Sequence, residues 1–341
     1  MNKRLLPLFT GLIVLAGLCV HAVHAQSFYT GKTVRLIVGA SAGGGLDTYA
    51  RAVARHLGKH IPGNPVVIVE NMTGAGGLVA ANHLSRVARP DGLTVGHFLG
   101  SLLLGQALGQ PGIEFDARKF EYVGAAVKED VVCAVTKASG IATFEQWTAS
   151  TTPIKLGATG PGAPPYNTPR ILKTALGLPI QLISGYKGTA EIRLAAESGE
   201  VAGGCWAWDS MKVTWRKALD AGEAVVVLQV TPKALAELPR VPLAITFARS
   251  DEARRLIQVG IHDSSAYARP FVLPPGTPTE RVQMLRKAFQ SALEDRALVD
   301  EAEKANLRFD PVRGDDVQKA ISELFTLDPR LVARLKEILQ N

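Results

Sequence analysis

The chain has 341 residues, a formal net charge of +7 and three cysteines, and 47% of its residues are hydrophobic. This length corresponds to roughly two domains and is enough to bury a sizeable core. A charged fraction of 20% excludes wholesale disorder. Three cysteines exclude a disulfide-stapled miniprotein and a zinc site built from four cysteines. Lys and Arg are scattered with no run of five or more, so we expect no nucleic-acid partner.

Residues 1–25 have the pattern of a secretory signal peptide. Lys3 and Arg4 give a positive start, residues 5–20 are largely apolar, and a small residue, Ala25, precedes the expected cleavage point. The apolar stretch falls short of the about 20 residues that span a bilayer. Cleavage would lower the charge to +5, because Lys3 and Arg4 carry two of the positive charges. We therefore expect an exported, soluble protein.

Strands and helices alternate along the remaining chain. Residues 34–38 are predicted to form a strand, 39–45 a glycine-rich loop, and 46–57 a helix, because apolar residues recur there at helical spacing. The same order follows through a strand at 66–69, a loop at 71–77 and a helix to about 87. Further strands are expected at 94–99, 131–135, 155–158, 181–183 and 224–230, and a last helix from about 315 to the C-terminus. Such alternation predicts parallel sheets covered on both faces.

Four loops join a strand to a helix through glycine. Each loop directs unpaired backbone N–H groups, at the positive end of a helix dipole, toward one place. In open α/β sheets such loops lie at the carboxyl ends of strands, where ligands bind. The first two loops therefore favour binding of a small anion such as a carboxylate over ordinary turns. Asp47 stands in the first turn or at the cap of its helix, where it accepts from a ligand, orders the loop or caps the helix.

A hydrolase is the sharpest enzyme alternative. Gly39-Ala-Ser41-Ala-Gly43 matches G-x-S-x-G between a strand and a helix, as a nucleophile elbow requires. However, no earlier strand supplies an oxyanion-hole loop, and His262 is the one histidine in the last two-thirds of the chain. An exported serine hydrolase using Ser41 is kept as the alternative function.

Two histidines and two tryptophans lie close together in the sequence, and each pair could have a binding or a structural role. His56 and His60 have a spacing that can bind zinc, but no third ligand is evident, so we expect a solvated helix end and neither metal nor cofactor. Trp206 and Trp208 flank one residue, and either wall a pocket or pack in the core.

The two cysteines that remain after cleavage are Cys133 and Cys205. In an oxidising compartment they can pair, and separate buried thiols are an equal alternative.

A set of motifs recurs in a fixed order: Tyr29-x-Gly-Lys-x-Val-Arg-Leu-Ile-Val38, Ala42-Gly-Gly-Gly-x-Asp47, Val69-Glu-Asn71, Gly74-Ala-Gly-Gly77, Pro90-Asp-Gly-x-Thr94, Gly160-x-Gly162, Tyr186-x-Gly188 and Pro274-x-Gly-Thr-Pro278. Together they resemble the substrate-binding proteins of tripartite tricarboxylate transporters, the Bug-type periplasmic receptors. The resemblance covers nearly all of residues 27–341. It implies a type II periplasmic-binding-protein fold, an α/β architecture of two lobes with a ligand cleft between them. Lobe 1 would comprise residues 26–127 plus 266–341, and lobe 2 the inserted residues 128–265.

The resemblance also implies a site in which the two glycine loops of lobe 1 hold a carboxylate, largely through backbone N–H groups and ordered water. Carried over by position, the ligand-binding residues are Ser41, Ala42, Gly43, Gly44, Asp47, Gly74, Ala75, Gly76, Gly77, Ser101, Thr159, Gly160, Gly162, Gly188, Thr189, Trp206 and Asp209. The implied function is a monomeric, non-catalytic receptor that captures a small mono-, di- or aromatic carboxylate and delivers it to membrane permease subunits. A ligand-bound sensor for a membrane signalling partner is a further alternative.

Overall fold

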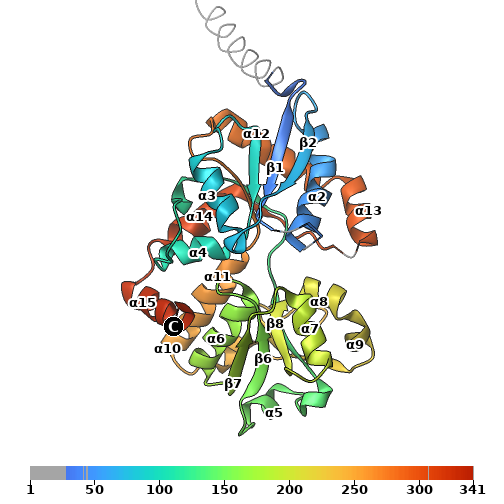
Figure 1. The fold of residues 1–341 in the computed structure, drawn as a ribbon, viewed down its shortest axis with the longest axis vertical. Coiled ribbons are helices and arrows are strands. Elements are labelled where there is room, and N and C mark those ends of the chain that lie inside the picture. Colours follow the sequence, from blue (N-terminus) through green and yellow to red (C-terminus); the bar gives the residue numbers. More distant parts are fainter. Residues whose placement is uncertain (1–27, 41, 44, 306, 341) are drawn as a thin grey trace, which may run out of the picture.

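Two mixed sheets, each covered by helices on both faces, form two lobes that lie one above the other (Figure 1). The structure is a computed structural model that describes residues 28–40, 42–43, 45–305 and 307–340. The predicted signal peptide lies outside the described residues. None of the helices in these ranges is long and apolar enough to cross a membrane.

The sheet of lobe 1 has six strands. Their spatial order is β11 (Val312–Arg313), β4 (Glu121–Ala125), β10 (Pro270–Leu273), β3 (Thr94–His97), β1 (Thr33–Val38) and β2 (Val66–Asn71). β1 runs parallel to β2 and β3, so the carboxyl ends of all three strands meet at one edge. That edge faces lobe 2 (Figure 1).

The sheet of lobe 2 has five strands, in the order β7 (Ile180–Ser184), β6 (Ile154–Ala158), β8 (Gly203–Ala207), β5 (Val131–Thr136) and β9 (Ala224–Val230). β6 is parallel to β7 and β8, whereas β5 is antiparallel to β8 and β9. β10 is likewise antiparallel to β3 and β4. The expectation of parallel sheets is therefore wrong for the strands that follow a crossing between lobes, because the chain enters each sheet there from the opposite end.

The helices complete both lobes. Those around the first sheet are α2 (Gly45–Leu57), α3 (Leu78–Arg86), α4 (Ser101–Ala107), α12 (Thr279–Leu293), α13 (Arg296–Lys304) and α14 (Gly314–Leu324). Those around the second are α5 (Phe144–Thr148), α6 (Pro164–Leu176), α7 (Thr189–Glu197), α8 (Trp208–Thr214), α9 (Arg216–Asp220), α10 (Asp251–Ile257) and α11 (Asp263–Ser265).

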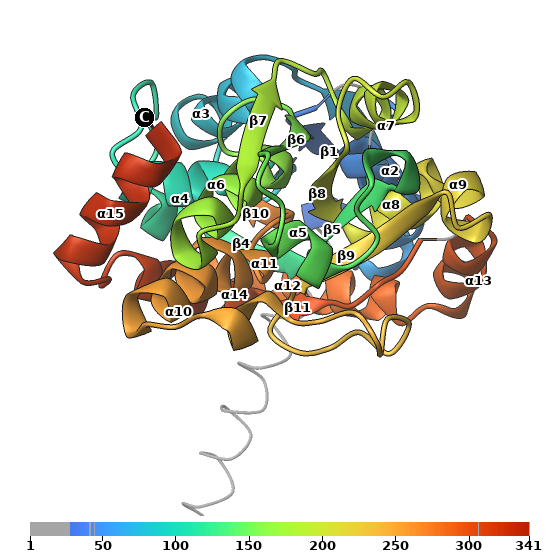
Figure 2. The same cartoon turned by 90° about the horizontal axis from the view of Figure 1, so that it is seen from below.

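The C-terminal segment differs from the single helix that the sequence predicts. α14 ends at Leu324, and a separate helix, α15 (Pro329–Gln340), follows and packs against α6 and α10 (Figure 2). Pro329 explains the break, because proline lacks an N–H and restricts the preceding residue to extended backbone, while it suits the first position of a helix. Asp328 accepts a hydrogen bond from the Arg330 N–H at 2.7 Å and starts α15.

A disulfide joins Cys133 and Cys205, whose pairing the sequence alone did not decide. Cys133 on β5 lies directly opposite Cys205 on β8, and the two sulfurs are bonded. Both residues are fully buried. The bridge closes a sequence separation of 72 residues and ties the strand that enters lobe 2 to the strand that leads into α8. A disulfide is typical of an exported protein.

Candidate functional site

The first glycine loop, between β1 and α2, is held by a buried carboxylate. Asp47 is 1% exposed, and its Oδ2 accepts hydrogen bonds from the Gly43 N–H and the Arg51 Nε, both at 2.8 Å. The Asn71 Nδ2 donates to the Asp47 Oδ1 at 2.9 Å and to the Ala40 carbonyl at 2.8 Å. Both carboxylate oxygens are therefore engaged by the loop and its neighbours, which suits the loop-ordering role among those predicted for Asp47.

The electrostatics of Asp47 agree with this geometry. Burial opposes its charged form, but the hydrogen bonds from Arg51, Gly43 and Asn71 outweigh burial and lower the pKa of the carboxyl to about 2. Asp47 is thus ionised at neutral pH. Ala42 and Gly43 are exposed at the loop surface, whereas Ser41 and Gly44 lie outside the described residues.

The second glycine loop, between β2 and α3, needs its glycines for two reasons. Gly74, Gly76 and Gly77 have φ values of 131°, 65° and 94°, and Ala75 between them has φ of 45°, a region that residues with a Cβ rarely adopt. In addition, a Cβ on Gly77 would lie 2.8 Å from the Gly39 carbonyl oxygen. The two loops therefore touch through backbone at the carboxyl edge of the sheet, and α2 and α3 run from them over opposite faces of that sheet.

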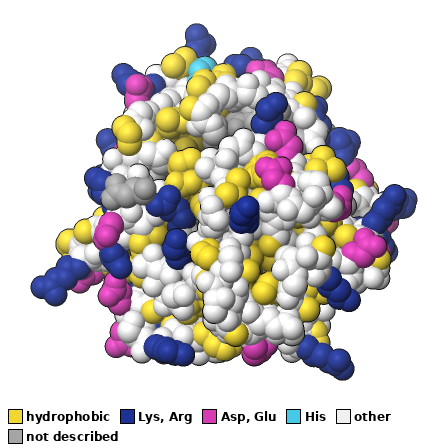
Figure 3. Space-filling view, turned by 60° about the horizontal axis from the view of Figure 1, so that its bottom comes forward, with side chains coloured by type: hydrophobic (Ala, Val, Ile, Leu, Met, Phe, Trp, Pro, Cys, Tyr) yellow, Lys and Arg dark blue, Asp and Glu magenta, His cyan; other side chains and the backbone are white. Residues whose placement is uncertain are grey.

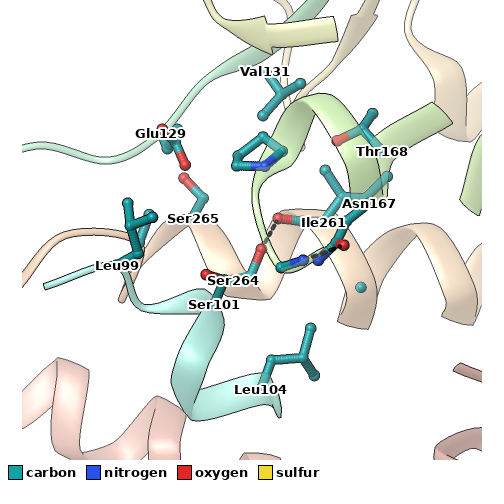
Figure 4. Close-up of a pocket in the computed structure, with 14 residues that line it drawn as sticks. Leu99, Ser101, Leu104, Glu129, Val131, Asn167, Thr168, Ile261, Ser264 and Ser265 are labelled. Atoms are coloured by element: carbon teal, nitrogen blue, oxygen red, sulfur yellow. Dashed lines mark hydrogen bonds between the residues drawn. The ribbon is translucent and has the colours of Figure 1, made fainter. Parts of the chain in front are cut away.

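Lobe 2 approaches lobe 1 at Ser101, the first residue of α4. A Cβ on Gly162 would lie 3.5 Å from the Ser101 Oγ, and the Gly162 N–H donates to the Asn167 Oδ1 at 3.1 Å. Figure 4 shows Ser101 facing Asn167 of α6 and Ser264 of α11 across a small cavity. This cavity of about 30 Å³ has room for a water molecule and not for a carboxylic acid, so the lobes are nearly in contact at this end.

Three lobe 2 residues predicted for the site lie on loops at the carboxyl ends of β6 and β7. The hydroxyl of Thr159 is buried without a hydrogen-bond partner among the described residues, and a Cβ on Gly160 would meet open space. Gly188 also borders open space and precedes Thr189, the first residue of α7.

Of the residues that the sequence singled out on β8 and α8, Trp206 and Trp208 are buried and Asp209 is half-buried. Trp206 is 2% exposed and stacks on Trp215 with ring centroids 5.5 Å apart, so it packs in the core of lobe 2. Trp208 donates its Nε1–H to the Glu237 Oε2 at 3.0 Å. The Oδ1 of Asp209 lies 3.4 Å from the Lys212 Nζ.

Two charged residues near the first glycine loop, Arg269 and Glu129, belong to none of the motifs described from the sequence. Arg269, on the segment that returns to lobe 1, pairs through Nη2 with the Glu129 Oε1 at 3.0 Å; Glu129 lies on the segment that leaves lobe 1. Asn71 and Arg51, which fix Asp47, were also absent from the predicted set. The asparagine at the end of a strand before a glycine loop was the available signal for Asn71, because such a position faces the ligand edge.

The histidines of the described ranges do not gather into a metal or catalytic centre. His56 Nε2 lies 3.0 Å from Glu301 Oε2, and His60 Nε2 lies 2.8 Å from Asp295 Oδ2, so each histidine contacts a different carboxylate near α13. Among the described residues no group of three metal-ligating side chains occurs. His262 is buried in a π-helical turn over Gln258–His262. Figure 3 shows Lys and Arg scattered over one face of the molecule with Asp and Glu between them.

Comparison with known proteins identifies the family. The profile of the tripartite tricarboxylate transporter family receptor, TctC, matches residues 49–336. The UPF0065 protein in the TAR-I ttuE-ttuC' intergenic region of Agrobacterium vitis is 27% identical over 306 residues, which cover 88% of this chain and 81% of that protein.

Solved structures share the fold. The periplasmic binding protein BugD superposes with a TM-score of 0.67 at 21% identity, covering 91% of this chain and 98% of that one. MatC from Rhodopseudomonas palustris with bound malate gives 0.65 at 19% identity, covering 90% and 99%. A second R. palustris protein, solved with adipate, gives 0.67 at 21% identity, covering 90% and 97%. The fold is that of a periplasmic binding protein, and the chain is a non-enzymatic solute-binding receptor that belongs to the tripartite tricarboxylate transporter receptor family.

Proposed function

We propose that this receptor captures a small mono-, di- or aromatic carboxylate between its lobes. The observation that carries the proposal is the backbone contact between the Gly39 carbonyl and Gly77, because it brings together two glycine loops that each lead into a helix. The positive end of a helix dipole at each loop suits an anion. The malate and adipate in two structures of the same fold support a carboxylate as the ligand.

Capture would involve lobe closure. The ligand carboxylate would rest on residues 42–45 and 74–77 of lobe 1, and residues 159–162 and 188–189 of lobe 2 would close over its other end. A ligand that contacts both lobes stabilises the closed arrangement by its differential affinity for it. Asp47 would position the first loop without touching the ligand, since its oxygens are already engaged.

The receptor would work in the periplasm and deliver its ligand to the membrane permease subunits of a tripartite transporter. The predicted signal peptide supports export, and the Cys133–Cys205 disulfide supports an oxidising compartment. Fractionation of cells that express the full chain tests this location: a periplasmic product that begins near Gln26 is expected, and an uncleaved cytoplasmic product would contradict it.

Ligand binding is tested on the chain that begins at Gln26. Malate, adipate and benzoate cover the three acid classes, and the corresponding primary amides have nearly the same shape without the charge. Binding to the folded state raises the melting temperature with ligand concentration, so at least one acid should shift it and its amide should not. Shifts by the amides alone would overturn the proposal.

A further inference from the structure

Arg269 lies at the carboxyl edge of the lobe 1 sheet, beside the first glycine loop. It immediately precedes β10, on the segment that returns to lobe 1, and its side chain is 14% exposed. The start of β10 pairs with β4 and lies beside the end of β3, so Arg269 stands at the sheet edge where the glycine loops also lie.

The guanidinium group of Arg269 reaches the first glycine loop. A Cβ on Gly45, the first residue of α2, would lie 3.8 Å from the Arg269 Nη1. The Arg269 Cζ lies 5.4 Å from the ring centroid of Tyr49, one turn further along α2. The cation is therefore beside the same helix end that presents the backbone N–H groups of the loop.

Among the described residues, Glu129 is the side chain that hydrogen-bonds to the guanidinium. Nη2 contacts the Glu129 Oε1 at 3.0 Å, and both side chains are mostly buried. A guanidinium has five N–H donors in a fixed planar fork, so the bond to Glu129 leaves donors for a second acceptor.

The nearby groups on α2 do not supply that acceptor. Burial raises the pKa of Tyr49 to about 12, and its O–H donates to the Arg308 carbonyl at 2.9 Å. Asp47 accepts from Gly43, Arg51 and Asn71 and is almost fully buried. On the side of the glycine loop the guanidinium faces a helix N-terminus, which is a positive environment that itself attracts an anion.

We infer that Arg269 is a specificity-determining residue that donates a charge-assisted hydrogen bond to the ligand carboxylate, with Glu129 as its positioning residue. This inference rests on the proposed function. A backbone cradle alone also accommodates a neutral amide oxygen, whereas a guanidinium favours a charged acceptor. Arg269 would therefore supply the preference of the receptor for acids over their amides.

The test compares acid and amide affinities in matched variants. Calorimetric titration of malate, adipate and benzoate, each with its primary amide, gives the ratio of the two Kd values for the acid that binds best. Arg269→Gln should weaken acid binding roughly tenfold or more and leave amide binding within about threefold, so that the ratio collapses. Arg308→Gln is the control. It breaks the ion pair with Asp130, which lies next to Glu129 on the segment that leaves lobe 1, and it should leave the ratio of the two Kd values unchanged.

Glu129→Gln separates ligand contact from a purely structural link. The glutamine amide oxygen still accepts from Arg269, but the negative charge is gone, so acid binding should stay equal or become tighter. If acid binding weakens by the same factor as in Arg269→Gln, the ion pair only links the segment that leaves lobe 1 to the segment that returns to it. That result would overturn the inference. If Arg269→Gln does not fold, the Glu129→Gln titration decides alone: acid binding that is equal or tighter supports the inference, and a weakening of roughly tenfold overturns it.

The outcomes also distinguish this inference from the proposed function. If the wild type binds none of the three acids, both fail. If it prefers acid to amide and Arg269→Gln keeps that preference, only the role of Arg269 is overturned.

Discussion

The carboxylate of Asp47 accepts a hydrogen bond from the Gly43 N–H at 2.8 Å, four residues earlier in the chain. The same oxygen accepts from Arg51 one turn later. Asp47 thereby joins the glycine loop to the body of α2, and the loop conformation depends on one buried charge. A loop fixed before the ligand arrives loses less conformational entropy on binding.

Removing that charge should weaken both folding and binding. Asp47→Ala is expected to lower the free energy of unfolding by about 2 kcal/mol, because hydrogen bonds to a charged group are lost, and to weaken carboxylate binding. Urea unfolding and calorimetry measure the two effects. Glu70→Gln is the matched control, since Glu70 forms a bidentate pair with Arg35 on the exposed side of β2. It should cost less than about 0.5 kcal/mol, and an equal loss in both variants would refute the role of Asp47.

The contact between the glycine loops predicts different responses of two neighbouring glycines. Gly76→Ala meets open space and carries only the strain of a positive φ, about 1 kcal/mol. Gly77→Ala adds a Cβ 2.8 Å from the Gly39 carbonyl oxygen, so the loops must separate, at a cost of about 3 kcal/mol. Thermal unfolding of both variants checks this order. Equal melting temperatures would show that the two loops are not in contact.

Buried histidines should make the protein less stable at mildly acidic pH. Burial lowers the pKa of His97 to about 3 and that of His262 to about 4, whereas both residues have a pKa near 6.5 when unfolded. As the pH falls below 6.5, the unfolded chain binds protons that the folded protein does not. Between pH 7 and pH 5 each histidine should cost about 2 kcal/mol of stability.

Replacing one histidine tests this linkage. His97→Asn keeps a donor toward the Pro270 carbonyl, which His97 Nδ1 contacts at 3.0 Å. The variant will have lower absolute stability, because it loses the stacking on Phe271. Its loss of stability between pH 7 and pH 5 should nevertheless be about half that of the wild type, and an unchanged loss would contradict a neutral His97.

The disulfide should contribute a large part of the stability. Cross-linking residues 72 positions apart reduces the entropy of the unfolded chain by the equivalent of about 4 kcal/mol in the chain-entropy picture. The double variant Cys133→Ala with Cys205→Ala should lose stability of that order in urea unfolding. Reductant added to the native wild type should have little effect, because both cysteines are fully buried. A double variant as stable as the wild type would show that the bridge is dispensable.

The parts of the fold that were predictable are those set by local sequence. Glycines placed between an apolar strand and a helical pattern located the loops at Gly43 and Gly77, and the strand at Ala224–Val230 was predicted with the bounds that the structure has. The antiparallel pairing of β10 was missed, because it depends on a chain that leaves the first sheet and returns to it more than a hundred residues later.

The site shows the same division. The glycine loops can be recognised from their residue types. In contrast, Arg269 and Glu129 are 140 residues apart in sequence and belong to no motif. Their pairing follows from the lobe crossings, which no local pattern encodes. Trp206 is the reverse case, since its residue type left a pocket wall and core packing equally open and the structure packs it on Trp215.

The central claim is that the paired glycine loops hold the ligand carboxylate, and a crystal structure with the best-binding acid tests it most directly. The account predicts carboxylate oxygens within about 2.7–3.2 Å of backbone nitrogens in residues 42–45 and 74–77. A carboxylate seated elsewhere in the cleft, with no backbone nitrogen of either loop within hydrogen-bond distance, would contradict it.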